Sequence, residues 1–187
     1  MASLGLVGGC TAEPPEPVDP SVSVPEVTAA PSPTPTPTTP PEAVKPVEPD
    51  AMSQPGTEGA AAAAEYFLSL YPYVYATGDL TSMKSMIDPE CIFCADVVAD
   101  VTADVAAGLT TVGGTVRVDA TRSTQISDEF YSVDLTVETD PSQAIDGTGG
   151  VVESFAAGSG TAVMIVLGAP GRWIIRAVEL TRTGTGS

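Results

Sequence analysis

The stretch EGAAAAAEYFLSLYPYVY, residues 58–75, decides the fold because it is the strongest helix signal in the chain. Its five consecutive alanines are the best helix formers, and large apolar residues follow them at helical spacing. Pro72 lies inside this pattern and is expected to bend or interrupt the helix. The globular part of the chain is therefore expected to open with a helix.

Two further helices are predicted behind the first. The segment ATGD, residues 76–79, supplies a glycine stop and an N-cap for a second helix that runs through Ile87. A third helix is expected from about Glu90 to Ala107, with valines on one face. Its aspartates recur every four residues on another face. We interpret them as a solvated face, because the ligands of a calcium site converge from a loop. The aspartates are Asp96, Asp100 and Asp104.

After Gly113 and Gly114 the apolar period changes to two, which predicts strands. The last two strands are apolar on both faces and are expected to form a closing hairpin at the centre of the sheet or at an interface. Helices followed by strands predict an α+β fold, with three N-terminal helices packed on a curved four- to five-stranded antiparallel sheet. The strands are expected over residues 115–124, 130–139, 150–156, 161–168 and 172–181.

Strict alternation also assigns side chains to the faces of two strands. In the first strand, Val116, Val118 and Ala120 are expected on one face, with Arg117, Asp119 and Thr121 on the other. In the last strand, Ile174, Val178 and Leu180 are expected on one side, where they would offer an outer sheet face for a homodimer or scaffold.

The first part of the chain has a different composition. Fourteen of the 18 prolines lie between residues 13 and 55, where seven acids stand against Lys45 and no aromatic residue occurs. Such a segment buries too little apolar surface to offset its ordering entropy. Residues 11–55 are therefore expected to form a disordered Pro/Thr/Glu-rich linker, with or without sugars on its threonines. Residues 56–187 are expected to form a single domain.

The charge of the chain limits its partners. The chain has 24 acidic and seven basic residues and no histidine, which gives a formal net charge of −17. This surface offers no electrostatic footprint for phosphate backbones, so nucleic acid is not expected as a partner. It also disfavours direct adhesion to anionic lipids.

The first ten residues, MASLGLVGGC, resemble the end of a bacterial lipoprotein signal, with Val7, Gly8 and Gly9 in the lipobox positions before Cys10. Residues 1–10 are then a truncated signal, and lipidated Cys10 is the mature N-terminus. The alternative is a chance cysteine near a terminus. The expected location is extracytoplasmic, with the chain held on the outer face of the cell membrane by the lipid.

Cys91 and Cys94 form a CxxC pair, which can be a redox centre, half of a metal site or a disulfide. A zinc site needs about four ligands, and the chain has one pair and no histidine. A reactive thiolate needs neighbouring cations, whereas the neighbours here are acidic. A disulfide is the expected state outside the cell, and we expect neither a metal nor a cofactor.

The lipobox, the Pro/Thr arm, YATGDL at residues 75–80, the CxxC pair and GRW at residues 171–173 together resemble an uncharacterised family of actinobacterial lipoproteins. That family has a single extracytoplasmic domain of unknown function. The order of helices and strands resembles the nuclear-transport-factor-2-like cone, in which helices pack into the concave side of the sheet. The resemblance implies a fold and a location, and no activity.

In cones of this type a pocket often lies between helices and sheet, and six large residues are candidates for its lining, although they could simply be core. The expected function is a non-catalytic module that binds a small apolar or sugar-like ligand or an envelope protein. The alternative is an enzyme of the ketosteroid-isomerase kind, for which Asp134, Glu153 and Tyr66 are nominated. No residue is assigned as catalytic. The lining candidates are Tyr66, Tyr71, Tyr75, Phe93, Tyr131 and Trp173.

Overall fold

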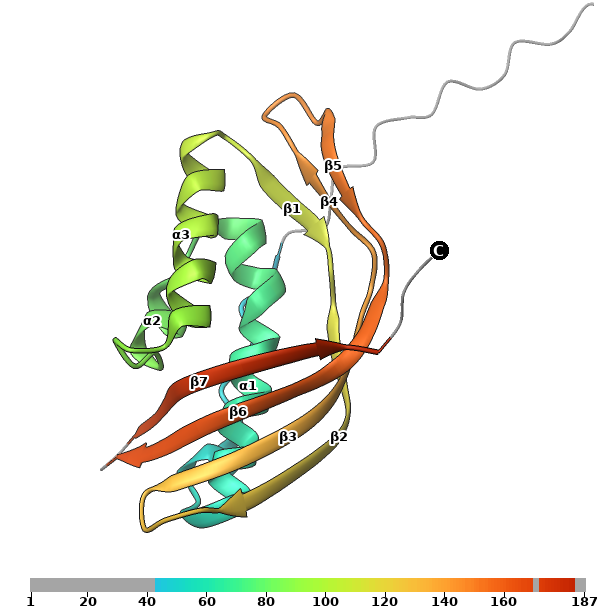
Figure 1. The fold of residues 1–187 in the computed structure, drawn as a ribbon. Helices are drawn as coiled ribbons and strands as arrows, with labels where there is room; N and C mark the ends of the chain where they lie inside the picture. The colour runs from blue at the N-terminus through green and yellow to red at the C-terminus, as the bar shows by residue number, and fades with distance from the viewer. Residues whose placement is uncertain (1–42, 170–171, 184–187) are drawn as a thin grey trace, which may run out of the picture. The chain divides into compact units, whose positions relative to one another are not determined.

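The structure of the protein is a computed structural model that describes residues 43–169 and 172–183. These residues belong to one compact unit, Thr39–Ser187. The signal, Cys10, the arm up to residue 42 and the turn at Pro170 and Gly171 lie outside the described residues. In chain order (Figure 1) the elements are the 3-10 helix η1 (Asp50–Ser53), α1 (Gly56–Thr77), α2 (Thr81–Ser85), α3 (Ile92–Ala106), β1 (Thr110–Gly113), β2 (Val116–Gln125), β3 (Phe130–Thr139), β4 (Ser142–Ile145), β5 (Val151–Phe155), β6 (Gly158–Ala169) and β7 (Arg172–Arg182).

The strands form two antiparallel sheets, with orders β2-β3-β6-β7 and β1-β4-β5. Three chain segments run from one sheet into the other and bend where they cross, as Figure 1 shows for β1 to β2, β3 to β4 and β5 to β6. Gly113 and Gly114 form the first bend with φ of +82° and +73°, values that side chains disfavour. Two backbone bonds, Gly114 to Pro141 at 3.0 Å and Asp140 to Thr115 at 2.9 Å, continue the ladder through it.

The expected α+β class is confirmed, and the four-stranded sheet contains four of the five predicted strands. The fifth, at residues 150–156, belongs instead to the second sheet, where it pairs with β4, and β4 pairs in turn with β1. Strands β1 and β4 were not predicted. Both missed strands are only four residues long, TTVG and SQAI, and neither alternates apolar with polar residues. Their pairing is set by the strands they continue.

Helix α1 runs along the inner side of the sheets and contacts five of their strands (Figure 1). It is continuous through Pro72, so the expected interruption there is wrong. Leu70 and Val74, on either side of the proline, are completely buried, and this packing holds the helix together despite the lost hydrogen bond. The expected glycine stop is Gly78, with a left-handed φ of +73°.

The two shorter helices lie where the sequence analysis placed them. Helix α2 ends before the predicted Ile87, because that residue forms a bridge with Ile175 of β7. Hydrogen bonds from Thr81 and Tyr73 hold the pKa of Asp79, which precedes α2, down to about 2, and the charge of Lys45 adds to this effect. None of the helices in the described part of the chain is long and apolar enough to cross a membrane.

Residues 43–55, which we call the strap, are ordered against the domain, although the linker was predicted to reach residue 55. Met52 packs on the core, and its carbonyl oxygen accepts a 2.8 Å hydrogen bond from the indole nitrogen of Trp173. A buried indole N–H needs an acceptor, and the strap supplies it. Composition alone misplaced this boundary because a proline-rich segment can still be fixed by one apolar side chain and one backbone carbonyl.

A β-bulge changes the predicted faces of β2. The pairing runs from Val118 opposite Val137 to Ala120 opposite Thr136, so Asp119 is an extra residue. Ala120 is therefore exposed rather than on the face of Val118. Thr121 turns toward α1 instead, and its hydroxyl donates a 2.5 Å hydrogen bond to the Glu65 carboxylate.

A second bulge, at Arg176, changes the faces of β7. Ile174, which is only 6% exposed, lies between the core residues Trp173 and Ile175, and alternation places it on the opposite face of the strand. Beyond the bulge, Val178 packs against the core, and Leu180 pairs with the buried Ala162 on the same inner face. The expected outer patch of Ile174, Val178 and Leu180 is therefore wrong, because one extra residue reverses the alternation.

Gly59 sets the distance between α1 and the sheet, and its replacement tests this. A Cβ at this position would lie 2.5 Å from Cζ2 of Trp173 and would also collide with the carbonyl oxygen of Gln54. We expect Gly59→Ala to lower the free energy of unfolding by about 1–3 kcal/mol, measured by urea denaturation followed by circular dichroism. Gly147→Ala is the control, because nothing lies within 4 Å of its Cβ position. Equal stability of the two variants would contradict the close packing of α1.

Candidate functional site

Five of the six aromatic residues nominated for a pocket fall into two separate groups. Tyr131 and Trp173 meet edge to face with ring centroids 5.5 Å apart, and each is less than 9% exposed. Tyr71 packs against Tyr75 at 5.0 Å and against Phe93 at 6.4 Å. Tyr66 is buried in the core. The structure therefore does not bring the six side chains around one pocket.

The space between α1 and the four-stranded sheet is filled by apolar side chains. The largest are completely or almost completely buried and come from α1, α2 and the three inner-facing strands beneath them. Tyr66, Tyr131 and Trp173 belong to the same core. The side chains that fill this space are Phe67, Leu70, Met83, Val133, Leu135, Met164, Val166 and Ile175.

Two hollows lie at the end of the domain where the strap crosses the sheet. The larger, which we call the strap groove, has a volume of about 870 Å³, and the smaller, the side groove, has about 310 Å³. Four residues line both hollows: Glu48, Met52, Arg172 and Trp173. Of the nominated aromatic residues, Trp173 reaches both grooves, Tyr131 the strap groove and Tyr66 the side groove.

The walls of the strap groove come from three parts of the fold. The strap forms one wall, the turn between β2 and β3 contributes Glu129, and the ends of β6 and β7 contribute Gly168 and Arg172. Gly168 matters for the shape, because a Cβ there would lie 3.1 Å from the Trp173 ring. The strap wall was not predicted, because the composition of that segment is typical of a disordered linker. Met52, a large apolar residue between two prolines, is the signal that could have revealed it.

Charged groups surround an aromatic floor in the strap groove. The exposed carboxylates of Glu48, Asp50 and Glu129 line it together with the exposed guanidinium of Arg172. The floor is the Tyr131 and Trp173 pair, and the indole N–H of Trp173 is already bonded to the strap. The groove therefore offers acceptors from carboxylates, donors from one arginine and only a narrow strip of ring surface.

The second aromatic group fixes α3 to α1. Burial raises the pKa of Tyr75, and the hydrogen bond with Tyr71 and the charges of Asp100 and Asp104 act in the same direction. The acidic stripe predicted as solvated is exposed at Asp96 and Asp100 and half-buried at Asp104. Within the described residues, no three His, Cys, Asp or Glu side chains are grouped so that they could hold a metal ion.

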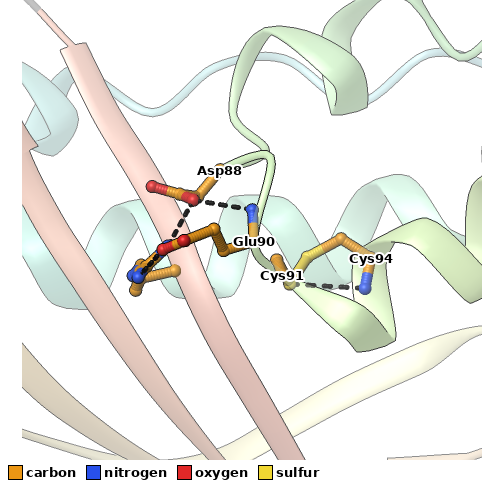
Figure 2. A network of polar contacts seen from close by, with 5 residues as sticks. Asp88, Glu90, Cys91 and Cys94 are labelled. Atoms are coloured by element: carbon orange, nitrogen blue, oxygen red, sulfur yellow. Dashed lines mark hydrogen bonds and ion pairs between the residues drawn. A yellow bond between two sulfur atoms is a disulfide. The ribbon is translucent and has the colours of Figure 1, made fainter.

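Cys91 and Cys94 form the expected disulfide in the first turn of α3 (Figure 2). The Sγ of Cys91 accepts a 3.3 Å hydrogen bond from the backbone N–H of Cys94, so the cystine also caps the helix. The two residues are 2% and 0% exposed. A thiol partner cannot reach sulfurs that are buried in this way, which favours a structural role over thiol exchange.

The segment before the disulfide is fixed to β7 by a polar network (Figure 2). Oδ1 of Asp88 accepts hydrogen bonds from Nη1 of Arg176 at 2.6 Å and from the backbone N–H of Glu90 at 2.8 Å. Arg176 also forms an ion pair with the Glu90 carboxylate. The bulge in β7 aims the guanidinium at this loop, and backbone bonds from Ile175 to Met86 and from Asp88 to Ile175 flank it.

The residues nominated for catalysis do not form a site. Asp134 on β3 and Glu153 on β5 are both exposed and belong to different sheets. Tyr66 is buried on α1. A carboxylate base and its oxyanion partners must face one enclosed space, and these three side chains do not.

A family model described as "Family of unknown function (DUF6318)" matches residues 34–179, which confirms the expected domain of unknown function. The sequence matches no curated protein. Among solved structures, the intermembrane space region of the chloroplast protein ARC6 is similar, with a TM-score of 0.54 and 10% identity over 70% of this chain and 99% of that one.

Two other solved structures are similar at lower scores. A nuclear transport factor 2 (NTF2-like) superfamily protein from Salmonella enterica serovar Typhimurium has a TM-score of 0.47 and 12% identity, and covers 71% of this chain and 96% of its own. A putative scytalone dehydratase from Novosphingobium aromaticivorans has a TM-score of 0.44 and 14% identity, and covers 65% and 83%. Of the three, only the ARC6 region is similar enough to bear on the fold, and none bears on activity.

The disulfide closes a short loop, so its removal should have a local and modest effect. We expect the double variant Cys91→Ser, Cys94→Ser to lower the free energy of unfolding by roughly 2 kcal/mol, measured by urea denaturation without reductant. Wild-type protein that has been reduced with dithiothreitol in the unfolded state and refolded in its presence is the matched control. Its loss should be similar, and the double variant should not respond to reductant. Rapid labelling of wild-type thiols under native reducing conditions would contradict the burial of the cystine.

Proposed function

The chain belongs to the family of unknown function DUF6318, and we propose that its domain is a non-catalytic binding module whose ligand occupies the strap groove. The observation that carries this proposal is the convergence of two hollows on Glu48, Met52, Arg172 and Trp173, beside a core that is otherwise filled. A concave site lined by a few convergent polar groups is where proteins usually bind small molecules.

The lining of the groove favours a polar ligand over the apolar one first considered. Tyr131 and Trp173 are 6% and 8% exposed, so an apolar ligand would gain little buried area on the aromatic floor. Three carboxylates against one guanidinium favour ligands that bring hydroxyl groups or a cation. The ligand class that fits is a hydroxyl-rich amine, such as an amino sugar.

We also propose that the module is a lipoprotein held outside the cell through Cys10. Its supports are the lipobox-like sequence before Cys10 and the linker, whose composition disfavours burial. The strap joins the linker to the groove, so the ligand site lies at the root of the tether. We further propose that the domain has the nuclear-transport-factor-2-like cone fold and that the chain is one of an actinobacterial family of lipoproteins.

The alternative functions have less support. An enzyme of the ketosteroid-isomerase kind needs a carboxylate in an enclosed site, whereas Asp134 and Glu153 are exposed. A scaffold that dimerises through the outer sheet face loses Val178 and Leu180, which the bulge at Arg176 turns to the inner face.

Three sugars of different charge test the groove. Trp173 is the only tryptophan in the chain, so its fluorescence reports directly on this site. We expect cationic glucosamine to bind more tightly than neutral N-acetylglucosamine, and anionic gluconate to bind least, because carboxylates outnumber the guanidinium.

Two matched variants localise the effect. Glu129→Gln should weaken glucosamine binding about twofold to fivefold, because it removes one exposed carboxylate from the rim. Glu179→Gln, on the outer face of β7, removes the same charge at a distance and should leave binding unchanged. Equal binding of the cationic and anionic sugars, or an equal effect of the two variants, would contradict the proposed site.

Metabolic labelling tests the anchor separately. Because residues 1–10 form only a truncated signal, the chain is produced in a bacterial host with a complete signal sequence joined upstream of Val7 and with an alkyne-tagged palmitate. We expect the wild type to carry the tag and to partition into detergent. Cys10→Ser should lose both properties. The double variant Cys91→Ser, Cys94→Ser is the control and should keep them. A tag that persists on the Cys10→Ser chain would show that Cys10 is not the lipidated residue.

A further inference from the structure

Strand β5 presents an unusual edge. It pairs with β4 on one side and ends the order of the three-stranded sheet on the other. All five of its residues are exposed, including Val151 at 54%, Val152 at 59% and Phe155 at 46%. An exposed apolar strand at a sheet edge is a ready template for another strand.

The other edges of the two sheets are protected in ways that β5 is not. The edge of β7 is bridged by the backbone of Met86 and Asp88 at Ile175. The edge strand β2 has a bulge at Asp119 and carries both Arg117 and Arg122. Strand β1 is only four residues long and packs against α1. Charges, bulges and covering segments are the usual means by which proteins prevent edge pairing.

On β5, these protections are reduced to one bulge and one charge. The register shifts at Val152, while Glu153 to Phe155 pair regularly with β4. Glu153 is the only charged residue of the strand and takes part in none of the ion pairs formed among the described residues. The free edge therefore combines a regular backbone from Glu153 to Phe155 with exposed apolar side chains and a carboxylate that joins none of these ion pairs.

The charge of this region indicates the kind of partner. The hairpin of β4 and β5 carries Asp146 and Glu153 and has neither lysine nor arginine. Asp146 is engaged within the turn, where its Oδ1 accepts bonds from Thr148 and Gly150. Glu153 is thus the carboxylate available to a partner, and a basic side chain complements it.

A second copy of the chain suits this edge less well. Antiparallel pairing of two β5 strands centred on Glu153 would place two carboxylates opposite each other. The copies would also repel, since residues 56–187 carry 17 acids against six bases. The acidic linker of the same chain has the same disadvantage.

We propose that the free edge of β5 binds an extended basic segment of a partner protein, which adds to the three-stranded sheet as a fourth strand. Main-chain hydrogen bonds supply the affinity, as in other cases of strand addition. A lysine or arginine opposite Glu153 and an apolar residue opposite Phe155, which lies on the same face, supply the selectivity. This site is separate from the strap groove and does not depend on it.

Synthetic peptides test the proposal on the full chain. The probe is a fluorescein-labelled peptide GKTVTKTVTKG, in which lysine and valine alternate on one face, and the matched control GETVTETVTEG carries glutamate in place of each lysine. A third peptide repeats the basic sequence with all internal backbone amides methylated, so that neither of its edges can pair as a strand. We expect fluorescence anisotropy to show binding of the basic peptide alone, with amide shift changes in nuclear magnetic resonance spectra at residues 151–157.

Two charge reversals distinguish an effect of the β5 edge on peptide binding from an effect of the net charge. Glu153→Lys should weaken binding of the basic peptide about threefold to tenfold. Glu179→Lys changes the net charge by the same amount, but the residue lies on the four-stranded sheet. This variant should therefore leave binding of the basic peptide unchanged. Both side chains are exposed, so both variants should fold.

Four outcomes would overturn the proposal. They are no binding of the basic peptide up to 1 mM, equal binding of the methylated peptide, equal effects of the two charge reversals, or a dimer in sedimentation that Val151→Lys dissociates. The last outcome would make a second copy the occupant of the edge.

Discussion

The enclosure of α1 is the constraint on which the rest of the structure depends. Ten of its residues are buried, and they lie on nearly every side of the helix. A helix of this kind must be covered all round, and a single flat sheet cannot do so. The sheets bend at Gly113 and Gly114 to follow the helix, and α2, α3 and the strap cover the remaining sides. Gly59 then allows the Trp173 ring to lie directly against the helix backbone.

The two bulges are the places where this constraint creates specific sites. An unbroken alternation would send Val178 and Leu180 to the outer face, and the extra residue Arg176 returns them to the inner one. The same extra residue directs a guanidinium to Asp88 and Glu90, which fastens the cystine turn to the edge of β7. One irregularity thus serves packing and edge protection together.

The elements with a clear periodicity of apolar residues were predicted from the sequence. The helix at residues 58–75, the alternating strands β2 and β3 and the closing hairpin follow from local pattern, and the disulfide follows from its spacing and acidic surroundings. The bulges, the short strands β1 and β4 and the order of the strap are consequences of tertiary pairing, which no local pattern contains. Two of the six nominated aromatic residues, Tyr131 and Trp173, do line the strap groove, but two of its three carboxylates, Glu48 and Asp50, lie in the segment assigned to the linker.

The hydrogen bond between the Trp173 indole and the carbonyl of Met52 would transmit mechanical force from the strap to β7. Tension applied at the N-terminal end of the strap would travel along residues 43–55 and enter the fold at η1, far in sequence from the strand that resists it. The indole passes that load to β7, which shares it with β6 through their paired backbones. A pulling force on the linker would first detach the strap, which forms one wall of the groove, and would unfold α1 only later. A pulling force would then weaken ligand binding in the groove, and a bound ligand would resist the detachment of the strap.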